Sequence, residues 1–272
     1  MAETHISFSA IDRYKFCPNA YKIIYVDGAP RTSNIFTVFG KAIHSTVEQI
    51  LLEQITKENS DESFKRNFLN IAKEEELEIP SSLDNIFQEM IQRGGILSVK
   101  AVEELYKKFN IKKIIGIEEE LLEPIFHPRV KTKKEYDFKG YVDLILELED
   151  GSWILLDWKT CSWGWDAKRK SDTLKQYQLT LYKHFTTLKK DVDSKKIKET
   201  YFVLIKRSAF KKDGTPKENA IEFVRVTCGD KKVQNSLKVL NNVMLNIDKE
   251  HFPKNRLSCS KCDFYKTQWC DA

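Results

Sequence analysis

The apolar positions of residues 1–110 recur every three or four residues, the spacing of helices that bury one face. Ser7 or Ser9 is expected to cap the first of these helices, and Pro18 is expected to interrupt it. Gly40 is expected to open the second. The predicted helices cover residues 10–25, 41–56, 61–78 and 83–109, with a break in the last at Gly94-Gly95.

From residue 111 the pattern changes to runs of β-branched, aromatic and aliphatic residues between short charged turns, which is typical of strands. Asp150-Gly151 lies between two such runs and predicts a hairpin turn. This order of elements predicts an α/β core with a helical N-terminal extension and an irregular, cysteine-rich tail. Strands are predicted at 111–122, 136–148, 153–159, 199–206 and 220–226, and helices at 171–188 and 230–249.

The composition fits one large domain, because 272 residues that are 41% hydrophobic and 31% charged can bury a sizeable core. No apolar run reaches the ~18–20 residues that span a bilayer, and residues 1–5 do not look like a secretory signal. We therefore expect no membrane association and a reducing, cytoplasmic location. In that compartment, six cysteines are thiols or metal ligands rather than disulfides.

Charge is distributed unevenly along the chain. Residues 1–124 carry 15 Lys and Arg against 20 Asp and Glu, a net charge of −5, whereas residues 125–272 carry 30 against 20, a net charge of +10. Clusters of lysine in the second half can neutralise phosphates, which favours a nucleic-acid partner. A solvated face on a lysine-rich protein explains the same asymmetry.

Two carboxylates and an ammonium come together at the end of the predicted hairpin. Pairing about the turn makes opposite positions sum to about 301, so Asp143 falls within one residue of a position facing Asp157. Asp157 and Lys159 share one face because side chains alternate along a strand. A structural ion pair would leave one carboxylate without a partner. Paired carboxylates that face a polyanion suit Mg²⁺ or Mn²⁺, and a nearby ammonium suits phosphodiester hydrolysis.

These motifs resemble a known nuclease family. Gly140-x-x-Asp143, a strand and Asp157-x-Lys159 resemble the core of the PD-(D/E)XK nucleases. The flanking motifs resemble the RecB-like branch, which includes the iron–sulfur nucleases of CRISPR adaptation and the AddB-type nuclease domains. They follow in family order along nearly the whole chain: Gly40-x-x-x-His44, Glu118 before the Asp143 strand, and Gln178-x-x-x-Tyr182 after the lysine.

The resemblance implies a PD-(D/E)XK restriction-endonuclease-like core, with a mixed central sheet flanked by helices. It further implies that His44, Asp143 and Asp157 bind the metal, with the carbonyl of Trp158 as a fourth ligand, and that Lys159 serves the attacking water. Read without the resemblance, a histidine on an apolar helix face is usually a core residue. The remaining catalytic residues that it implies are Glu118, Gln178 and Tyr182.

The tail ends in Cys259-x-x-Cys262 followed by Cys270, and Cys17 lies far upstream. Two thiolates at C-x-x-C spacing can hold one metal centre. The resemblance implies that these four cysteines hold a 4Fe–4S cluster, with zinc as the alternative because four thiolates suit both. Such a centre would tie the two ends of the chain together. Cys161 and Cys228 are expected to be ordinary small core residues.

Aromatic and basic residues alternate after Lys159. This composition suits a single strand, whose bases stack on aromatic rings and whose phosphates pair with cations. Both tryptophans could instead fill the space between sheet and helix. The candidate nucleic-acid-binding residues are Trp163, Trp165, Lys168, Arg169 and Lys170.

The expected division is a helical region at 1–110, a nuclease core at 111–250 and a tail at 251–272, all in one compact unit. The expected function is a metal-dependent DNA nuclease, foremost an exonuclease acting on ends or single strands in recombination or repair. The alternatives are a non-catalytic DNA-binding subunit with a nuclease-like fold and a redox or metal-carrier protein. The sequence has no phosphate-loop motif, so a helicase or recombination partner is expected to be a separate chain.

Overall fold

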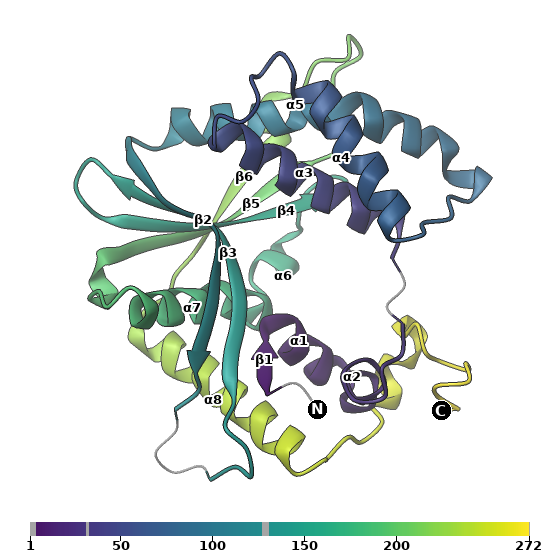
Figure 1. The fold of residues 1–272 in the computed structure, drawn as a ribbon, viewed down its shortest axis with the longest axis vertical. Helices are drawn as coiled ribbons and strands as arrows, with labels where there is room; N and C mark the ends of the chain where they lie inside the picture. Colours follow the sequence, from purple (N-terminus) through teal and green to yellow (C-terminus); the bar gives the residue numbers. More distant parts are fainter. Residues whose placement is uncertain (1–3, 31–32, 127–130, 272) are drawn as a thin grey trace.

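The computed structural model describes residues 4–30, 33–126 and 131–271 and is built around one mixed sheet (Figure 1). The strands run in the order β1-β3-β4-β5-β6, and β2 also pairs with β3. The β1–β3 and β4–β5 pairs are parallel and the others are antiparallel. The strands are β1 (His5–Ser7), β2 (Ile111–Pro124), β3 (Asp137–Leu148), β4 (Trp153–Cys161), β5 (Ile197–Lys206) and β6 (Ile221–Val226).

Helices cover both faces of the sheet (Figure 1). On one face α3 (Ile35–Leu51), α4 (Ser60–Glu74) and α5 (Asp84–Lys108) bury a core that includes Leu144 and Leu156 of the hairpin. On the other face α7 (Thr173–Lys189) and α8 (Asp230–Asp248) bury a second core with α1 (Phe8–Phe16). None of the described helices is long and apolar enough to cross a membrane. The expected fold class, a mixed sheet flanked by helices, is confirmed.

The first predicted helix is interrupted where the sequence indicates. Here α1 ends at Phe16, and α2 (Pro18–Tyr25) begins at the proline. Between them Cys17 is extended, with φ −160° and ψ 113°. Proline suits the first turn of a helix because its missing N–H has no intrahelical partner there.

Two expectations about the N-terminal half are wrong, and one strand there has no counterpart among the predicted elements. The residues before α1 form β1, which pairs with β3 more than 130 positions away. Helix α3 begins at Ile35 rather than at Gly40, because Asn34 accepts hydrogen bonds from the N–H groups of Phe36 and Thr37 in a capping box. Helix α5 runs through the glycine pair without a break.

Gly94 and Gly95 allow α4 and α5 to approach each other closely. A Cβ atom on Gly94 would lie 2.1 Å from the ring of Phe64, and one on Gly95 would lie 2.3 Å from Asp61 Oδ1. Both glycines therefore serve packing between helices, which their helix-breaking tendency in the sequence does not reveal.

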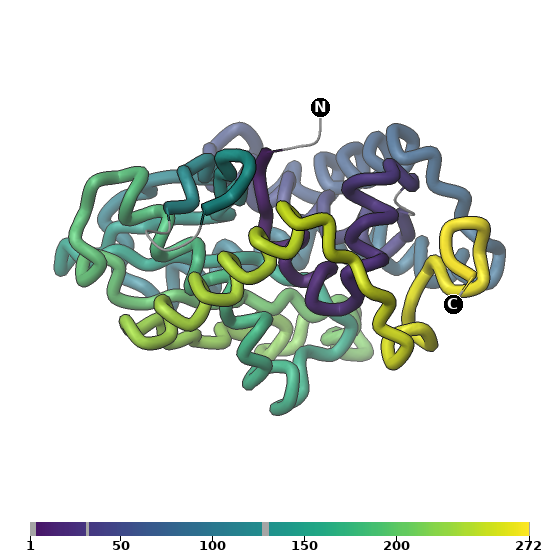
Figure 2. Tube along the Cα trace, turned by 90° about the horizontal axis from the view of Figure 1, so that it is seen from below, coloured from purple at the N-terminus to yellow at the C-terminus, as the bar shows by residue number. Residues whose placement is uncertain are grey.

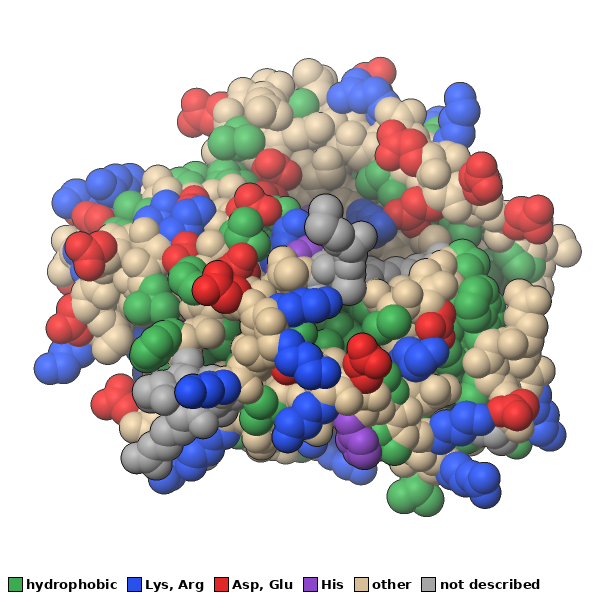
Figure 3. All heavy atoms as spheres, turned by 60° about the horizontal axis from the view of Figure 1, so that its bottom comes forward, with side chains coloured by type: hydrophobic (Ala, Val, Ile, Leu, Met, Phe, Trp, Pro, Cys, Tyr) green, Lys and Arg blue, Asp and Glu red, His purple; other side chains and the backbone are tan. Residues whose placement is uncertain are grey.

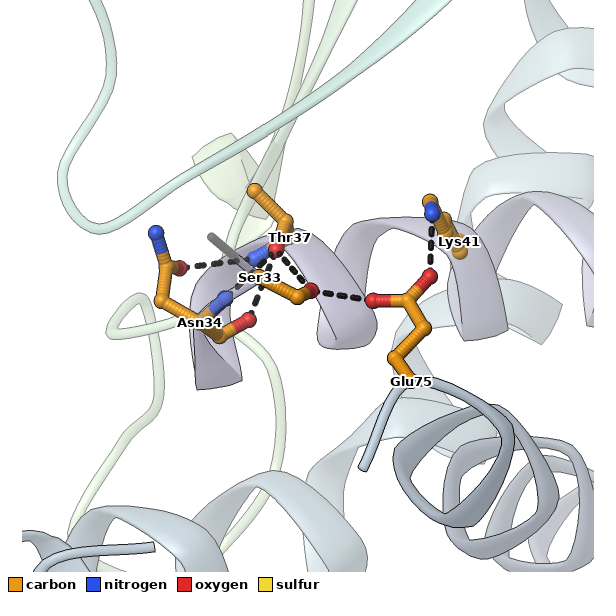
Figure 4. Close-up of polar contacts among 5 residues, drawn as sticks. All are labelled: Ser33, Asn34, Thr37, Lys41 and Glu75. Atoms are coloured by element: carbon orange, nitrogen blue, oxygen red, sulfur yellow. Dashed lines mark hydrogen bonds and ion pairs between the residues drawn. The ribbon is translucent and has the colours of Figure 1, made fainter. Parts of the chain in front are cut away.

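The start of α3 is fastened to the end of α4 by one carboxylate (Figure 4). Glu75 accepts a hydrogen bond from the Ser33 hydroxyl and pairs with the ammonium of Lys41. Thr37 Oγ1 in turn accepts from the N–H of Asn34 at 3.0 Å. These contacts fix the helix that carries His44.

The C-terminal tail returns to the first two helices (Figure 2). Tyr14 donates a hydrogen bond to the carbonyl of His251 at 2.6 Å, and the Asn255 amide donates to the carbonyl of Phe16 at 2.8 Å. The two chain ends therefore form one corner of the molecule.

Candidate active site

Asp143 and Asp157 face each other across the hairpin of β3 and β4. The ladder pairs Leu144 with Leu156 and Leu146 with Ile154, so opposite positions sum to 300 and the aspartates come one residue beyond the last paired position. Gly151 makes the turn with φ +77°, a conformation that suits glycine. The N–H of Trp158 donates to Asp143 Oδ2 at 2.6 Å, which links the two strands at this point.

Lys159 lies beside Asp157, as strand alternation predicts. Its Nζ is 2.5 Å from Asp157 Oδ2, while the Trp158 ring between them lies in the core on the opposite face. Burial lowers the pKa of Lys159, but the charges of Asp157 and Asp143 outweigh burial and leave this pKa raised. Lys159 is therefore an ammonium, and it faces two carboxylates.

Helix α3 places His44 over the same two strands. His44 Nε2 is 3.0 Å from the carbonyl oxygen of Trp158, and Nδ1 is 3.6 Å from Asp143 Oδ2. The close approach of helix and strand depends on Gly40, whose missing Cβ would lie 3.1 Å from Thr160 Oγ1. Burial lowers the pKa of His44, but Asp143 and a hydrogen bond with Glu118 raise it further, so the net shift is upward.

Glu118 completes the group from β2. Its backbone has φ +48°, the left-handed region that a glutamate rarely adopts inside a strand. Its Oε1 lies 3.9 Å from His44 Nδ1. The next two acids turn elsewhere: Glu119 pairs with Lys189 and Lys190, and Glu120 accepts from the hydroxyl of Tyr141.

His44, Glu118 and Asp143 each offer one ligand atom, and these atoms lie within 4.8 Å of one another. One imidazole and two carboxylates are a donor set for Mn²⁺ or Mg²⁺. Burial and the charge of Asp157 raise the pKa of Asp143 to about 7, although the charges of His44 and Lys159 act in the opposite direction. The residues fit a divalent cation. The resemblance read from the sequence implies a catalytic role for Glu118 but does not name it as a metal ligand.

Asp157 lies beside this group, and its carboxylate is held by a hydrogen bond and an ion pair. Its Oδ1 accepts a hydrogen bond from Gln178 Nε2 at 2.8 Å, and the same amide group lies 3.2 Å from the hydroxyl of Tyr182. Its Oδ2 is fully buried and, apart from the ion pair with Lys159, has no aligned hydrogen-bond donor among the described residues. Gln178 and Tyr182 project from α7 one turn apart, as the sequence predicts.

Two cavities open on either side of these residues. One, of about 690 Å³, is lined by α3 residues from Asn34 to Glu48 together with Glu118 and Thr160. The other, of about 470 Å³, is lined by Asp143, Asp157, Lys159 and the start of α1. The face shown in Figure 3 is hollowed near its centre, and Lys and Arg side chains lie along the lower rim of the hollow. Asp143 and Asp157 thus line one of the two cavities, and His44 and Glu118 line the other.

A family model for the PD-(D/E)XK nuclease superfamily matches residues 5–271. The chain belongs to this superfamily. Its fold is similar to the crystal structure of SSO0001, at 14% sequence identity and a TM-score of 0.42, over 97% of this chain and 85% of that one. No curated protein sequence matches the chain significantly. Membership of this superfamily implies a metal-dependent nuclease, and the group formed by His44, Glu118 and Asp143 fits a metal site of that kind.

In this superfamily member, the segment after Lys159 has two kinds of aromatic residue. Trp163 exposes 73% of its surface, whereas Trp165 exposes 7% and packs on Phe202 with ring centroids 5.1 Å apart. The guanidinium of Arg169 lies 4.8 Å from the Trp165 ring centre. Of the two tryptophans, only Trp163 presents its ring to solvent, so Trp165 fills the core.

The basic residues of the same segment also differ in their surroundings. Lys170 pairs with Glu222, which is shared with Lys206 at 2.7 Å. Lys168 and Arg169 are exposed. The lysine bound to Glu222 is therefore less available to a phosphate than its neighbours.

The four cysteines that the sequence singles out meet in one place. Cys17, Cys259, Cys262 and Cys270 all line a cavity of about 10 Å³ at the corner where the chain ends meet. The N–H of Asn255 donates to Cys17 Sγ at 3.4 Å, and the Asn19 amide donates to Cys270 Sγ at 3.6 Å. Cys161 and Cys228 lie elsewhere, against the sheet.

Proposed function

We propose that the chain is a metal-dependent deoxyribonuclease of the RecB-like branch, and that it acts as an exonuclease on DNA ends or single strands in recombination or repair. The observation that carries this proposal is the convergence of His44, Glu118 and Asp143 beside the Asp157–Lys159 pair. A purely structural ion pair would need neither His44 nor a glutamate in a left-handed backbone conformation.

In this proposal His44, Asp143, Asp157 and the carbonyl of Trp158 hold Mg²⁺ or Mn²⁺, and Glu118 adds a carboxylate to the set. A bound cation of this kind polarises a phosphoryl oxygen and lowers the pKa of water. The Lys159 ammonium orients the attacking water and offsets negative charge at the scissile phosphate. Gln178 keeps Asp157 in place through its hydrogen bond at 2.8 Å.

The cysteine corner is proposed to hold a 4Fe–4S cluster. A tetrahedral zinc site, with Zn–S bonds of about 2.3 Å, brings its sulfurs to about 3.8 Å from one another. What supports a centre here is that Cys17, Cys259, Cys262 and Cys270 line one small cavity, and four thiolates suit a 4Fe–4S cluster, with zinc as the alternative.

Cleavage of labelled single-stranded DNA and of labelled blunt-ended duplex DNA tests the nuclease activity. We expect cleavage with Mg²⁺ or Mn²⁺ and none in excess chelator. Glu118→Gln should lower the rate by about 100-fold, because it removes one charged ligand. Glu120→Gln is the matched control, since this neighbouring acid bonds Tyr141 and is not part of the group formed by His44, Glu118 and Asp143. Cleavage by Glu118→Gln at the parent rate would remove Glu118 from the site.

The mode of attack is tested with modified ends. An exonuclease releases label from a strand with one free end and leaves a circular single strand intact. Cutting of the circle would show endonuclease activity instead. DNA binding without any cleavage in either metal would favour the alternative, a non-catalytic DNA-binding subunit; a helicase partner would be a separate chain.

A further inference from the structure

The largest cavity beside the active site is bounded by segments that are far apart in the sequence. It has a volume of about 930 Å³ and shares Lys159, Gln178 and Phe8 with the cavity over the aspartates. Helices α1 and α7, the segment from Trp165 to Arg169, and the tail from Lys261 to Phe264 supply its walls. The space therefore leads from the cysteine corner to the reacting residues.

Three cations on these walls have no acidic partner. Arg13, Arg169 and Lys261 come from α1, the turn after β4 and the tail, and no carboxylate of the described chain lies within ion-pair distance of them. The guanidinium groups of Arg13 and Arg169 lie over aromatic rings, of Phe16 at 5.7 Å and of Trp165 at 4.8 Å. Cations that are held apart and left without a counter-ion attract a polyanion.

The acids in the same cavity leave this excess positive. Asp12 pairs with Lys175 at 2.8 Å. Asp172 caps α7 by accepting from the N–H of Leu174 at 2.9 Å, where the helix dipole stabilises its charge. Among the described residues, Asp172 and Asp263 are thus two acids without a cation partner, against three cations without an acidic partner.

We propose that Arg13, Arg169 and Lys261 form a phosphate-binding subsite for the nucleic-acid strand that leads into the active site. The proposal rests on the nuclease function above and names residues that bind its substrate away from the reacting phosphate. The subsite replaces part of the basic run read from the sequence, since Lys168 does not line this cavity and Lys170 is committed to Glu222.

The cysteine corner holds two of these three cations in position. The N–H of Cys17 donates to the carbonyl of Arg13 at 2.9 Å, and Lys261 directly precedes Cys262. Phe264, on the other side of Cys262, is buried with Cys17 and also lines the cavity. A centre that orders the four cysteines therefore also sets the spacing of Arg13 and Lys261.

Binding of a fluorescent oligo-dT strand, measured by anisotropy in chelator over a range of salt, tests the subsite without cleavage. Single-stranded DNA contributes about 0.7 to the salt slope for each phosphate contact. Arg13→Gln with Lys261→Gln should lower the slope by about 1.4 and weaken binding about 25-fold near 0.1 M salt. Arg13→Lys with Lys261→Arg should restore most of the affinity, since charge carries the effect.

Lys212→Gln is the matched control, because it removes one exposed cation from a turn that does not line this cavity. It should change the slope little. An unchanged slope in the Arg13 and Lys261 double variant would overturn the subsite, even in a protein that cleaves DNA. A parent protein that never cleaves, but whose binding depends on these cations, would refute the nuclease and keep the subsite.

Discussion

Three consecutive carboxylates on β2 have three different surroundings, and the backbone of one residue causes the difference. Glu118 has φ +48° and turns toward His44, whereas Glu119 and Glu120 bond lysines and a tyrosine outside the site. A left-handed glutamate costs on the order of 1–3 kcal/mol, and such strain is concentrated at functional sites. The conformation thus selects which acid reaches the cluster.

A second consequence at the residue scale concerns Asp143 in the metal-free protein. Its pKa is raised to about 7 by burial and by Asp157, so the folded state keeps a proton that the unfolded state loses near pH 4. This contribution to the free energy of unfolding is present at low pH and is lost as the pH rises from about 4 to about 7. Asp143→Asn should remove this loss.

Thermal or urea unfolding of the chelated protein at pH 5 and pH 8 measures this effect. At pH 8 the Asp143→Asn variant should be more stable than the parent by a few kcal/mol, which is the free energy that corresponds to a pKa shift on the order of three units. At pH 5 the two should be similar. Equal stabilities of the parent and the variant at both pH values would show that the pKa of Asp143 is not raised.

Metal binding adds a further test of the same group. Because Asp143 must lose its proton to act as a ligand, the affinity for Mn²⁺ should rise as the pH passes through about 7. Calorimetric titrations between pH 6 and pH 8 report both the affinity and the proton released. A Mn²⁺ affinity that does not change between pH 6 and pH 8 would show that other residues are the metal ligands.

At the scale of elements, the packing of α4 on α5 explains a glycine pair that looks like a helix break. Gly94→Ala should improve helix propensity by about 1 kcal/mol, yet the new methyl group meets the Phe64 ring. We expect net destabilisation of about 1–3 kcal/mol by urea unfolding, because overpacking outweighs propensity.

Two variants check that the clash causes this loss. Gln92→Ala, at an exposed position of α5, should change stability by less than about 0.5 kcal/mol. Phe64→Leu in the Gly94→Ala background should recover part of the loss by making room for the methyl group. Stabilisation by Gly94→Ala alone would mean that the interface between α4 and α5 can accommodate a methyl group.

On the scale of the whole molecule, the cysteine corner joins the first helices to the last residues of the chain. Cys17 and Cys262 lie in one cavity although 245 positions separate them. A metal centre there would stabilise the folded state, because it would close a very long loop and would bind only when the ends have met. The tail also forms a wall of the cavity that Arg13 and Arg169 line.

Protein purified without oxygen should be brown and contain iron and sulfide, and Cys262→Ser should lose the colour and unfold at a lower temperature. Cys228→Ser is the matched control, since this thiol contacts Thr200 on the sheet and does not line the corner cavity. Colourless protein with stoichiometric zinc would show that the same four cysteines hold zinc instead of an iron–sulfur cluster. Metal-free protein whose stability ignores Cys262→Ser would exclude the centre.

The sequence by itself determined the features that depend on short-range patterns. Apolar periodicity placed most helices and strands, and the Asp150-Gly151 turn brought Asp143 opposite Asp157 because a tight hairpin leaves little freedom of register. Alternation along β4 then put Lys159 beside Asp157. The ordered motifs around this hairpin identified the superfamily.

The tertiary structure alone decided what depends on distant partners. A three-residue run such as β1 has no pattern of its own and becomes a strand only through its pairing with β3. The reach of Glu118 depends on a backbone angle, and Gly94 is needed because Phe64 lies across from it. Arg13 and Lys261 line one cavity only after the chain ends meet. Such contacts arise between residues far apart in the chain, where local propensity carries no information.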